Sequence, residues 1–167
     1  MPLERRKAIY AIAAKYNLFI YEDDPYGEIR FTDNIVPTFK EMDTDNRVIY
    51  AGSYSKTLSA GLRVGFLYGP KQAIDAIQAL KNNQDGQMPL VTQRVVSRLL
   101  DVIDYDAQIK HVSTVYKEKA DLMMQTLRTH GSDKVHFVEP TGGMFLWLTM
   151  PDGVDCDASS KPVWSIR

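Results

Sequence analysis

The sequence predicts an α/β fold, with a mainly parallel sheet flanked by helices and followed by the start of a smaller α+β region. Short apolar runs at 18–21, 48–51 and 64–68 predict strands. They alternate with segments in which apolar residues recur every three or four positions, which predicts amphipathic helices. Strands that alternate with helices are typical of a parallel α/β sheet, which we expect up to about Leu100.

Taken in order, the first helix is expected over residues 4–16, where Ile9, Ile12, Ala13 and Tyr16 share one face. The strand 18–21 follows, and a polar connector over 32–46 separates it from the strand 48–51. After the strand 64–68, Gly69 and Pro70 end the extended segment. Two more helices are expected over 71–83 and about 91–100.

The later part of the chain predicts a different arrangement. From Tyr105 the apolar spacing is sustained long enough to predict one long helix, which ends near Gly131. Two strands, 135–138 and 144–148, are expected to form a hairpin around a turn at 140–143. We therefore expect an α/β segment over 1–100, the start of a second, α+β subdomain over 101–150 and an irregular tail over 151–167.

Composition restricts the possible functions. The 167 residues are 44% hydrophobic and 25% charged, which is typical of a soluble globular protein. A formal charge of −1 indicates neither a nucleic acid nor an acidic membrane as partner, and no apolar run is long enough for a membrane span. The N-terminus has no apolar signal-peptide core, so we expect a cytoplasmic protein. Cys156 is the single cysteine and the three histidines are scattered, so no metal site is expected.

The segment 51–65, AGSYSKTLSAGLRVG, contains the most informative chemistry. A strand leads into a turn that holds Ser53 and Ser55 and ends at Lys56, and Arg63 follows seven positions later. Short hydroxyls and an arginine at the end of a strand suit a phosphate group. A lysine beside that phosphate can form a Schiff base with a ligand that carries an aldehyde. The alternative for each residue is structural: a surface lysine, a turn serine or an arginine paired with a carboxylate.

Two further motifs accompany this turn. Asp23-Asp24-Pro25-Tyr26 fits the pattern D-x-x-Y, and the lysine turn fits S-x-S-K, four residues, G-x-R-x-G. A weaker match lies at 140–147, PTGGMFLW. Together these motifs resemble the class I/II aminotransferases of fold type I, the group that includes the 2-aminoadipate and aromatic enzymes. The resemblance runs from about residue 5 to about residue 151.

The resemblance implies a pyridoxal 5'-phosphate enzyme that moves an amino group from an amino acid to a 2-oxo acid. It implies that Lys56 binds the cofactor and moves the substrate proton, that Asp23 pairs with the pyridine nitrogen, and that Tyr26 donates to the phenolic oxygen. Ser53, Ser55 and Arg63 would hold the phosphate. Asp24 is expected to face a neighbouring loop or solvent. The complete protein would be a homodimer.

The resemblance also covers only the middle and later part of a full-length family member. Further phosphate contacts, a ring-stacking aromatic and an asparagine are expected from an earlier segment, and the arginine that binds the substrate carboxylate from a later one. Arg167 is not assigned that role. We therefore expect an incomplete chain with part of the large domain and the start of the small one.

Three functions remain open from the residues. An aminotransferase is favoured, while a lyase or decarboxylase of the same fold would use the same three residues, Lys56, Asp23 and Tyr26. A non-catalytic domain, either the effector-binding module of a regulator or a decayed remnant, is the third. The serine-acylase pattern S-x-x-K is also matched formally, but S-D-N and K-T-G are absent from the sequence.

Overall fold

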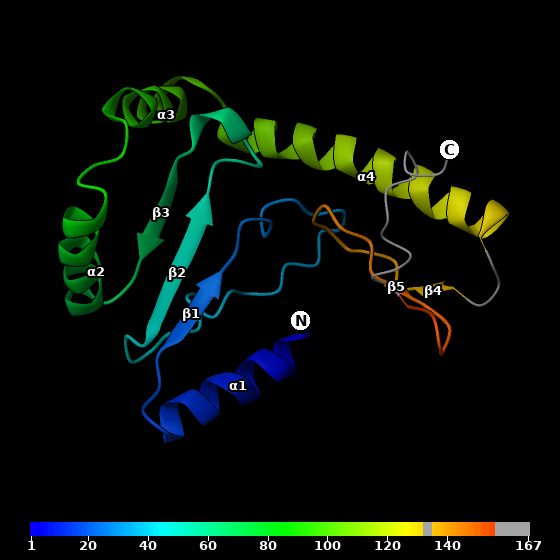
Figure 1. The fold of residues 1–167 in the computed structure, drawn as a ribbon, viewed down its shortest axis with the longest axis horizontal. Helices are drawn as coiled ribbons and strands as arrows, with labels where there is room; N and C mark the ends of the chain where they lie inside the picture. The colour runs from blue at the N-terminus through cyan, green and yellow to red at the C-terminus, as the bar shows by residue number, and fades with distance from the viewer. Residues whose placement is uncertain (132–134, 156–167) are drawn as a thin grey trace.

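The computed structural model describes residues 1–131 and 135–155, and Figure 1 shows the order of its elements. The four expected helices are confirmed, and each end lies within about two residues of its expected position. The elements are α1 (Leu3–Lys15), β1 (Ile20–Asp23), β2 (Val48–Ser53), the 3₁₀ turn η1 (Ala60–Leu62), β3 (Gly65–Tyr68), α2 (Lys71–Gln84), α3 (Leu90–Val102), α4 (Tyr105–His130), β4 (His136–Phe137) and β5 (Leu148–Thr149).

Strands β1, β2 and β3 form one sheet in that order. β1 and β2 are parallel, with Asp23 opposite Ala51, as expected. β2 and β3 are antiparallel, with Ser53 opposite Gly65, so the expectation of a parallel sheet is wrong for β3. The connection 54–64 contains only η1, and a parallel return needs a longer crossover that is usually a helix.

The first strand begins two residues later than expected. Asn17 has a positive φ of 52° and ends α1, and the Leu18 N–H donates to the Ala13 carbonyl at 2.8 Å. Pairing with the rest of the sheet therefore starts at Ile20, whose N–H donates to the Arg47 carbonyl at 3.0 Å. The strand also ends two residues later than expected, so Asp23 lies in the strand itself rather than after it.

The expected hairpin of 135–138 and 144–148 is also corrected. β4 and β5 pair as antiparallel strands, but with Phe137 opposite Leu148, so the segment between them is long. Part of that segment leaves the hairpin and pairs with the loop after β1, through the bridge between Arg30 and Gly142. A Cβ on Gly142 would lie 2.4 Å from the Ile29 carbonyl oxygen, so only glycine permits this backbone contact.

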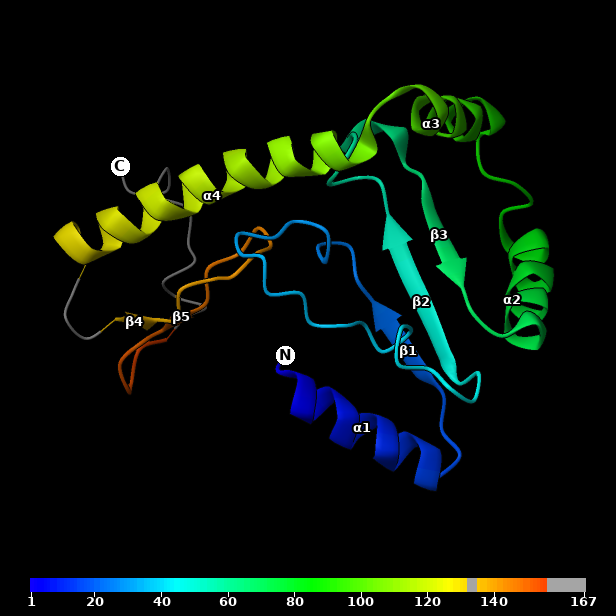
Figure 2. The same ribbon diagram turned by 180° about the vertical axis from the view of Figure 1, so that it is seen from behind.

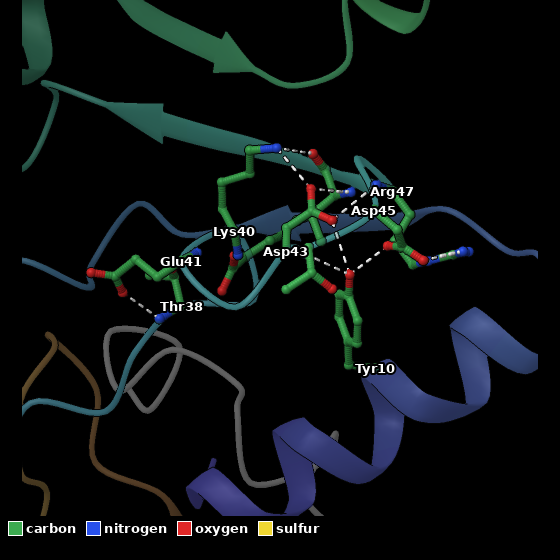
Figure 3. Close-up of polar contacts among 10 residues, drawn as sticks. Tyr10, Thr38, Lys40, Glu41, Asp43, Asp45 and Arg47 are labelled. Carbon is green, nitrogen blue, oxygen red and sulfur yellow. Dashed lines mark hydrogen bonds and ion pairs between the residues drawn. The ribbon is translucent and has the colours of Figure 1, made fainter.

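The connector 32–46 is held against α1 and β2 by a polar cluster, which we call the anchor network (Figure 3). It consists of Tyr10, Lys40, Asp43, Asp45 and Arg47. The Asp43 side chain is fully buried and accepts from the Lys40 ammonium at 2.8 Å, the Tyr10 hydroxyl at 3.1 Å and the N–H groups of Arg47 and Val48 at 3.0 and 3.1 Å. Burial alone would raise the pKa of Asp43, but these hydrogen bonds outweigh it and hold the pKa well below its usual range.

Arg47 joins the anchor network to the C-terminal end of α1. Its guanidinium donates to the carbonyls of Ala13 and Leu18, at 3.1 and 2.9 Å, and pairs with Asp45. The C-terminal end of α1 is therefore fixed to the start of β2.

The sheet and its helices leave much apolar surface open. Ile29, Val48 and Thr57 are fully buried, whereas Phe19, Tyr21 and Tyr68 are each more than 60% exposed. Figures 1 and 2 show α4 leaving the sheet at the end where β2 stops and running towards β4 and β5. In the part of the chain that the structure describes, no helix has both the length and the apolar character needed to cross a bilayer. Cys156, Arg167 and the expected tail beyond residue 155 lie outside the described residues.

Candidate functional site

The candidate site lies where β1 and β2 end. Because the two strands are parallel, their C-terminal ends meet at one edge of the sheet, which is where open α/β sheets bind ligands. Asp23 is the last residue of β1, and Ser53 is the last residue of β2. The Asp24 N–H donates to the Ala51 carbonyl at 2.9 Å, which keeps the two strand ends together.

The lysine turn, residues 53–59, is closed by its own hydrogen bonds. The Ser53 hydroxyl accepts from the Ser55 N–H at 3.1 Å, and the Tyr54 carbonyl accepts from the N–H groups of Leu58 and Ser59 at 2.9 and 3.1 Å. This geometry presents Lys56 as a half-buried side chain. Its ammonium nitrogen lies over the Tyr26 ring, 5.8 Å from the centroid, a cation–π distance. The structure therefore brings together two of the predicted site residues.

Arg63 reaches the same edge through strand pairing. The Tyr54 N–H donates to the Val64 carbonyl at 3.1 Å, which places Arg63 beside the lysine turn. Its backbone is left-handed, with φ 53° and ψ 38°, a conformation that costs a residue with a side chain about 1–2 kcal/mol. The exposed guanidinium makes one long hydrogen bond, 3.4 Å to the Ala60 carbonyl, among the described residues. It is therefore open to an anion.

The three neighbouring carboxylates at 22–24 differ in what they bind. Glu22 accepts from the N–H groups of Phe39 and Lys40, both at 2.9 Å, and so fixes the connector to β1. Asp24 accepts from the Tyr50 hydroxyl at 3.2 Å. Asp23 is exposed, and no described residue donates to its carboxylate.

Tyr50 accounts for the orientation of Asp24. Burial, and the adjacent Asp24 carboxylate, raise the pKa of Tyr50, so the phenol stays protonated and donates. Asp24 was expected to face a loop or solvent; instead it faces a residue of β2. Asp23 is thus the carboxylate left for a ligand, in keeping with its predicted role, which stays a prediction.

Tyr26 is half-buried in the loop after β1. The Ile29 N–H donates to its carbonyl at 2.9 Å, and the Phe145 ring meets its ring edge-on at 5.5 Å between centroids. Phe145 comes from the motif at 140–147, which was expected near the site but without a chemical role. Sequence reasoning did not find this aromatic contact, because it depends on the bridge between Arg30 and Gly142.

Open volume adjoins the unpaired carboxylate. A hollow of about 540 Å³ lies between the sheet and α2, lined by Asp23, Gly52, Phe66 and Ile77 among others. A second hollow, of about 250 Å³, is lined by Asp23 together with Arg6, Tyr21 and Phe39. Asp23 therefore lines two hollows.

These residues match the chemical groups of pyridoxal phosphate. Lys56 supplies an amine for an aldehyde, and Asp23 supplies a carboxylate to which no described residue donates a hydrogen bond. Ser53, Ser55 and Arg63 supply donors suited to a phosphate. In the described part of the chain no group of three or more histidine, cysteine or acidic residues is arranged to hold a metal ion.

The structure is a mixed α/β sheet with a lysine, a tyrosine and an exposed carboxylate at the edge where β1 and β2 end. The model of the family Aminotransferase class I and II matches residues 1–161, and the chain belongs to this family. The resemblance predicted from three short motifs is thereby confirmed.

Two relatives illustrate the match. The mitochondrial kynurenine/alpha-aminoadipate aminotransferase of Bos taurus is 39% identical over 148 residues, which cover 87% of this chain and 35% of that enzyme. The crystal structure of Pyrococcus horikoshii kynurenine aminotransferase, solved with PMP, superposes with a TM-score of 0.90 at 34% identity. It matches 95% of this chain and 39% of its own length. The chain thus spans little more than a third of such relatives, and its fold is part of the fold-type I aminotransferase fold.

The chain is also similar to a protein of another kind. The HTH-type transcriptional regulator TauR of Rhodobacter capsulatus is 31% identical over 157 residues, which cover 94% of this chain and 32% of that protein. A regulator with a domain of this family was among the alternatives drawn from the sequence.

Proposed function

We propose that the chain is the lysine-bearing part of an aminotransferase that uses pyridoxal 5'-phosphate. The observation that carries the proposal is the placement of the Lys56 amine over the Tyr26 ring, at the sheet edge where Asp23 is exposed and without a described partner. An amine, a phenol and a free carboxylate at one edge are the three groups that the chemistry requires. The similarity to aminotransferases supports the same reaction class.

Each residue has one task in this proposal. Bound pyridoxal phosphate supplies an aldehyde and an electron-withdrawing ring. Lys56 would hold the aldehyde carbon covalently, with loss of water, and would move the proton at the substrate Cα, while Asp23 would accept a hydrogen bond from the protonated ring nitrogen. Tyr26 donates a hydrogen bond to the phenolic oxygen. Ser53, Ser55 and Arg63 hold the phosphate, and in this way orient the ring.

The proposed substrates are an amino acid and a 2-oxo acid. The names of the bovine and archaeal relatives, which include kynurenine and alpha-aminoadipate, favour an amino acid with a long or aromatic side chain. We further propose a cytoplasmic homodimer for the complete protein, without a nucleic-acid partner. The exposed apolar side chains of Phe19, Tyr21 and Tyr68 support the burial of this surface in a larger assembly.

A second candidate is the effector-binding domain of a transcriptional regulator, which the similarity to TauR favours. In that case this chain would use the same edge to bind a ligand, without turnover. A lyase of the same fold would instead release a product other than a 2-oxo acid. Product analysis with a set of amino acids separates these three functions.

The test is selective labelling of Lys56. The chain is incubated with pyridoxal phosphate and reduced with borohydride, and the adduct is located by peptide mass spectrometry. We expect one adduct per chain, on Lys56, and none at that position in Lys56→Ala. The matched control is Lys71→Ala, which removes an exposed lysine paired with Asp75 and should leave the labelling unchanged. Adducts spread over surface lysines, and unaffected by Lys56→Ala, would refute the proposal.

A further inference from the structure

Tyr105, the first residue of α4, places its hydroxyl between the two loops that carry the candidate site. The hydroxyl lies 2.9 Å from the Thr57 hydroxyl and 2.8 Å from the Glu28 carboxylate. Thr57 follows Lys56 directly, and Glu28 comes two residues after Tyr26. One phenol from a third element therefore contacts both loops.

The hydrogen bonds have a defined direction. The Glu28 carboxylate only accepts, so the Tyr105 hydroxyl donates to it and is left to accept from Thr57. Burial raises the pKa of Tyr105, and the Glu28 charge adds to the effect against the opposing hydrogen bond from Thr57. The phenol therefore keeps its proton, and two successive hydrogen bonds run from the Thr57 hydroxyl to Tyr105 and from Tyr105 to the Glu28 carboxylate.

Thr57, at one end of these hydrogen bonds, is firmly held. Thr57 is 2% exposed, and its carbonyl accepts from the Gln108 amide at 3.0 Å, one turn further along α4. The Tyr54 ring, on the other side of Lys56, meets the Tyr105 ring edge-on at 6.3 Å between centroids. Residues on both sides of Lys56 are thus held by α4.

The Glu28 end is held by the short loop after β1. The Ile29 N–H donates to the Tyr26 carbonyl, and Ile29 is 1% exposed. The Arg30 N–H donates to the buried Ser113 hydroxyl of α4 at 3.3 Å. Hydrogen bonds within the loop and to α4 thus hold the backbone on both sides of Glu28.

We propose that Tyr105 is a positioning residue, which sets the separation between the Lys56 amine and the Tyr26 ring by tying Thr57 to Glu28 through a single hydroxyl. The inference rests on the proposed function and deepens it, since it assigns to α4 the placement of the lysine. Tyr105 itself touches no reacting atom.

The test compares four variants of the chain. Tyr105→Phe keeps the ring and removes the hydroxyl, and Thr57→Val keeps the shape and removes the donor. Thr57→Ser retains the donor and is the conservative rescue. Tyr116→Phe is the matched control, because Tyr116 lies on the same helix and its hydroxyl makes no hydrogen bond to a described residue.

Two readouts are taken for each variant. The first is the share of borohydride-reduced pyridoxal phosphate found on Lys56 relative to surface lysines. We expect about a fivefold to tenfold fall in Tyr105→Phe and Thr57→Val, and near-native values in Thr57→Ser and Tyr116→Phe. The second is amide hydrogen exchange without cofactor, which should become faster both in residues 26–30 and in residues 56–59 in the first two variants.

The outcomes distinguish this inference from the proposed function. Native labelling and native exchange in Tyr105→Phe would overturn the inference and leave the aminotransferase proposal intact. Faster exchange with unchanged labelling would also overturn it, because the hydroxyl would then be structural only. Failure of the native chain to label Lys56 would refute the proposed function itself, and the inference with it.

Discussion

The two ends of strand β2 lie in different surroundings. The anchor network binds its N-terminal end, and the lysine turn follows its C-terminal end. At the first end Asp43 is buried and accepts four hydrogen bonds, and Arg47 donates to two carbonyls of the α1 region. At the second end Asp23 is exposed and has no described partner, and Arg63 makes one long hydrogen bond. The two ends have similar residue types but differ in how many of their polar groups are satisfied.

This difference separates charges that stabilise the chain from charges that are free for a ligand. A buried carboxylate with several donors contributes to folding, and its removal leaves those donors unpaired. A carboxylate without partners contributes little to folding, but it can form a charge-assisted hydrogen bond with a bound molecule. The comparison predicts that substitutions at the two ends affect different measurements.

The largest effect is expected for Asp43→Asn. The amide has one accepting atom in place of two and presents donors to the Lys40 ammonium and to backbone N–H groups. We expect a loss of about 3 kcal/mol in the free energy of unfolding, measured by urea denaturation. Asp33→Asn, in the exposed part of the connector, is the control and should change it by less than about 0.5 kcal/mol. Equal losses in the two variants would remove the contrast between buried and exposed carboxylates.

The pH dependence of stability sharpens the same prediction. The pKa of Asp43 is lowered in the folded state, so its contribution is complete above its unfolded pKa, which is about 4. That contribution is lost as the pH falls below this value towards the folded pKa. The urea midpoint of the native chain should therefore fall between about pH 4 and pH 2, and the fall should be smaller in Asp43→Asn. An identical slope in both proteins would show that Asp43 is not the group responsible.

An intermediate effect, on binding alone, is expected for Asp23→Asn. The loss of the carboxylate should weaken pyridoxal phosphate binding by about 1.5–3 kcal/mol, or roughly tenfold to 150-fold, with stability changed by less than about 0.5 kcal/mol. Spectroscopic titration and urea denaturation measure the two quantities. Asp24→Asn is the matched control, and we expect weaker effects on binding there. A large loss of stability in Asp23→Asn would place this carboxylate with the structural group.

The smallest effect is expected for Arg63→Gly, and it has opposite signs in the two measurements. Glycine adopts the left-handed conformation without a steric cost, so the free energy of unfolding should rise by about 1 kcal/mol. The greater entropy of glycine in the unfolded chain offsets part of this gain. The guanidinium is lost, so affinity for pyridoxal phosphate should fall while affinity for pyridoxal, which has no phosphate, should not. An equal fall for both ligands would contradict a phosphate-binding role.

Much of the fold could be predicted because its signals are local. The long spacing from Tyr105, the capping residue Asp104 and the terminal Gly131 define α4 without reference to the rest of the chain. The direction of β3 and the place of Gly142 could not be predicted in this way. Both depend on which distant backbone segments pair with each other, and a short apolar run does not specify its partner strand.

The residues of the candidate site also fall into those predicted from local motifs and those that depend on distant contacts. Lys56, Asp23, Tyr26 and Arg63 could be named because their spacing in the sequence is itself the signal. Tyr105 could not, because a tyrosine at a helical apolar position predicts packing, and its hydroxyl gains a meaning only once Thr57 and Glu28 are placed around it.

The bridge between Arg30 and Gly142 also has a consequence for the order of folding. It joins residues more than a hundred positions apart, so its formation requires closing a loop far longer than the one between β1 and β2. Contacts of such long range form late, and during synthesis the lysine turn emerges well before residue 145 exists. In a nascent chain the Tyr26 ring therefore lacks the Phe145 contact until residue 145 has been synthesised.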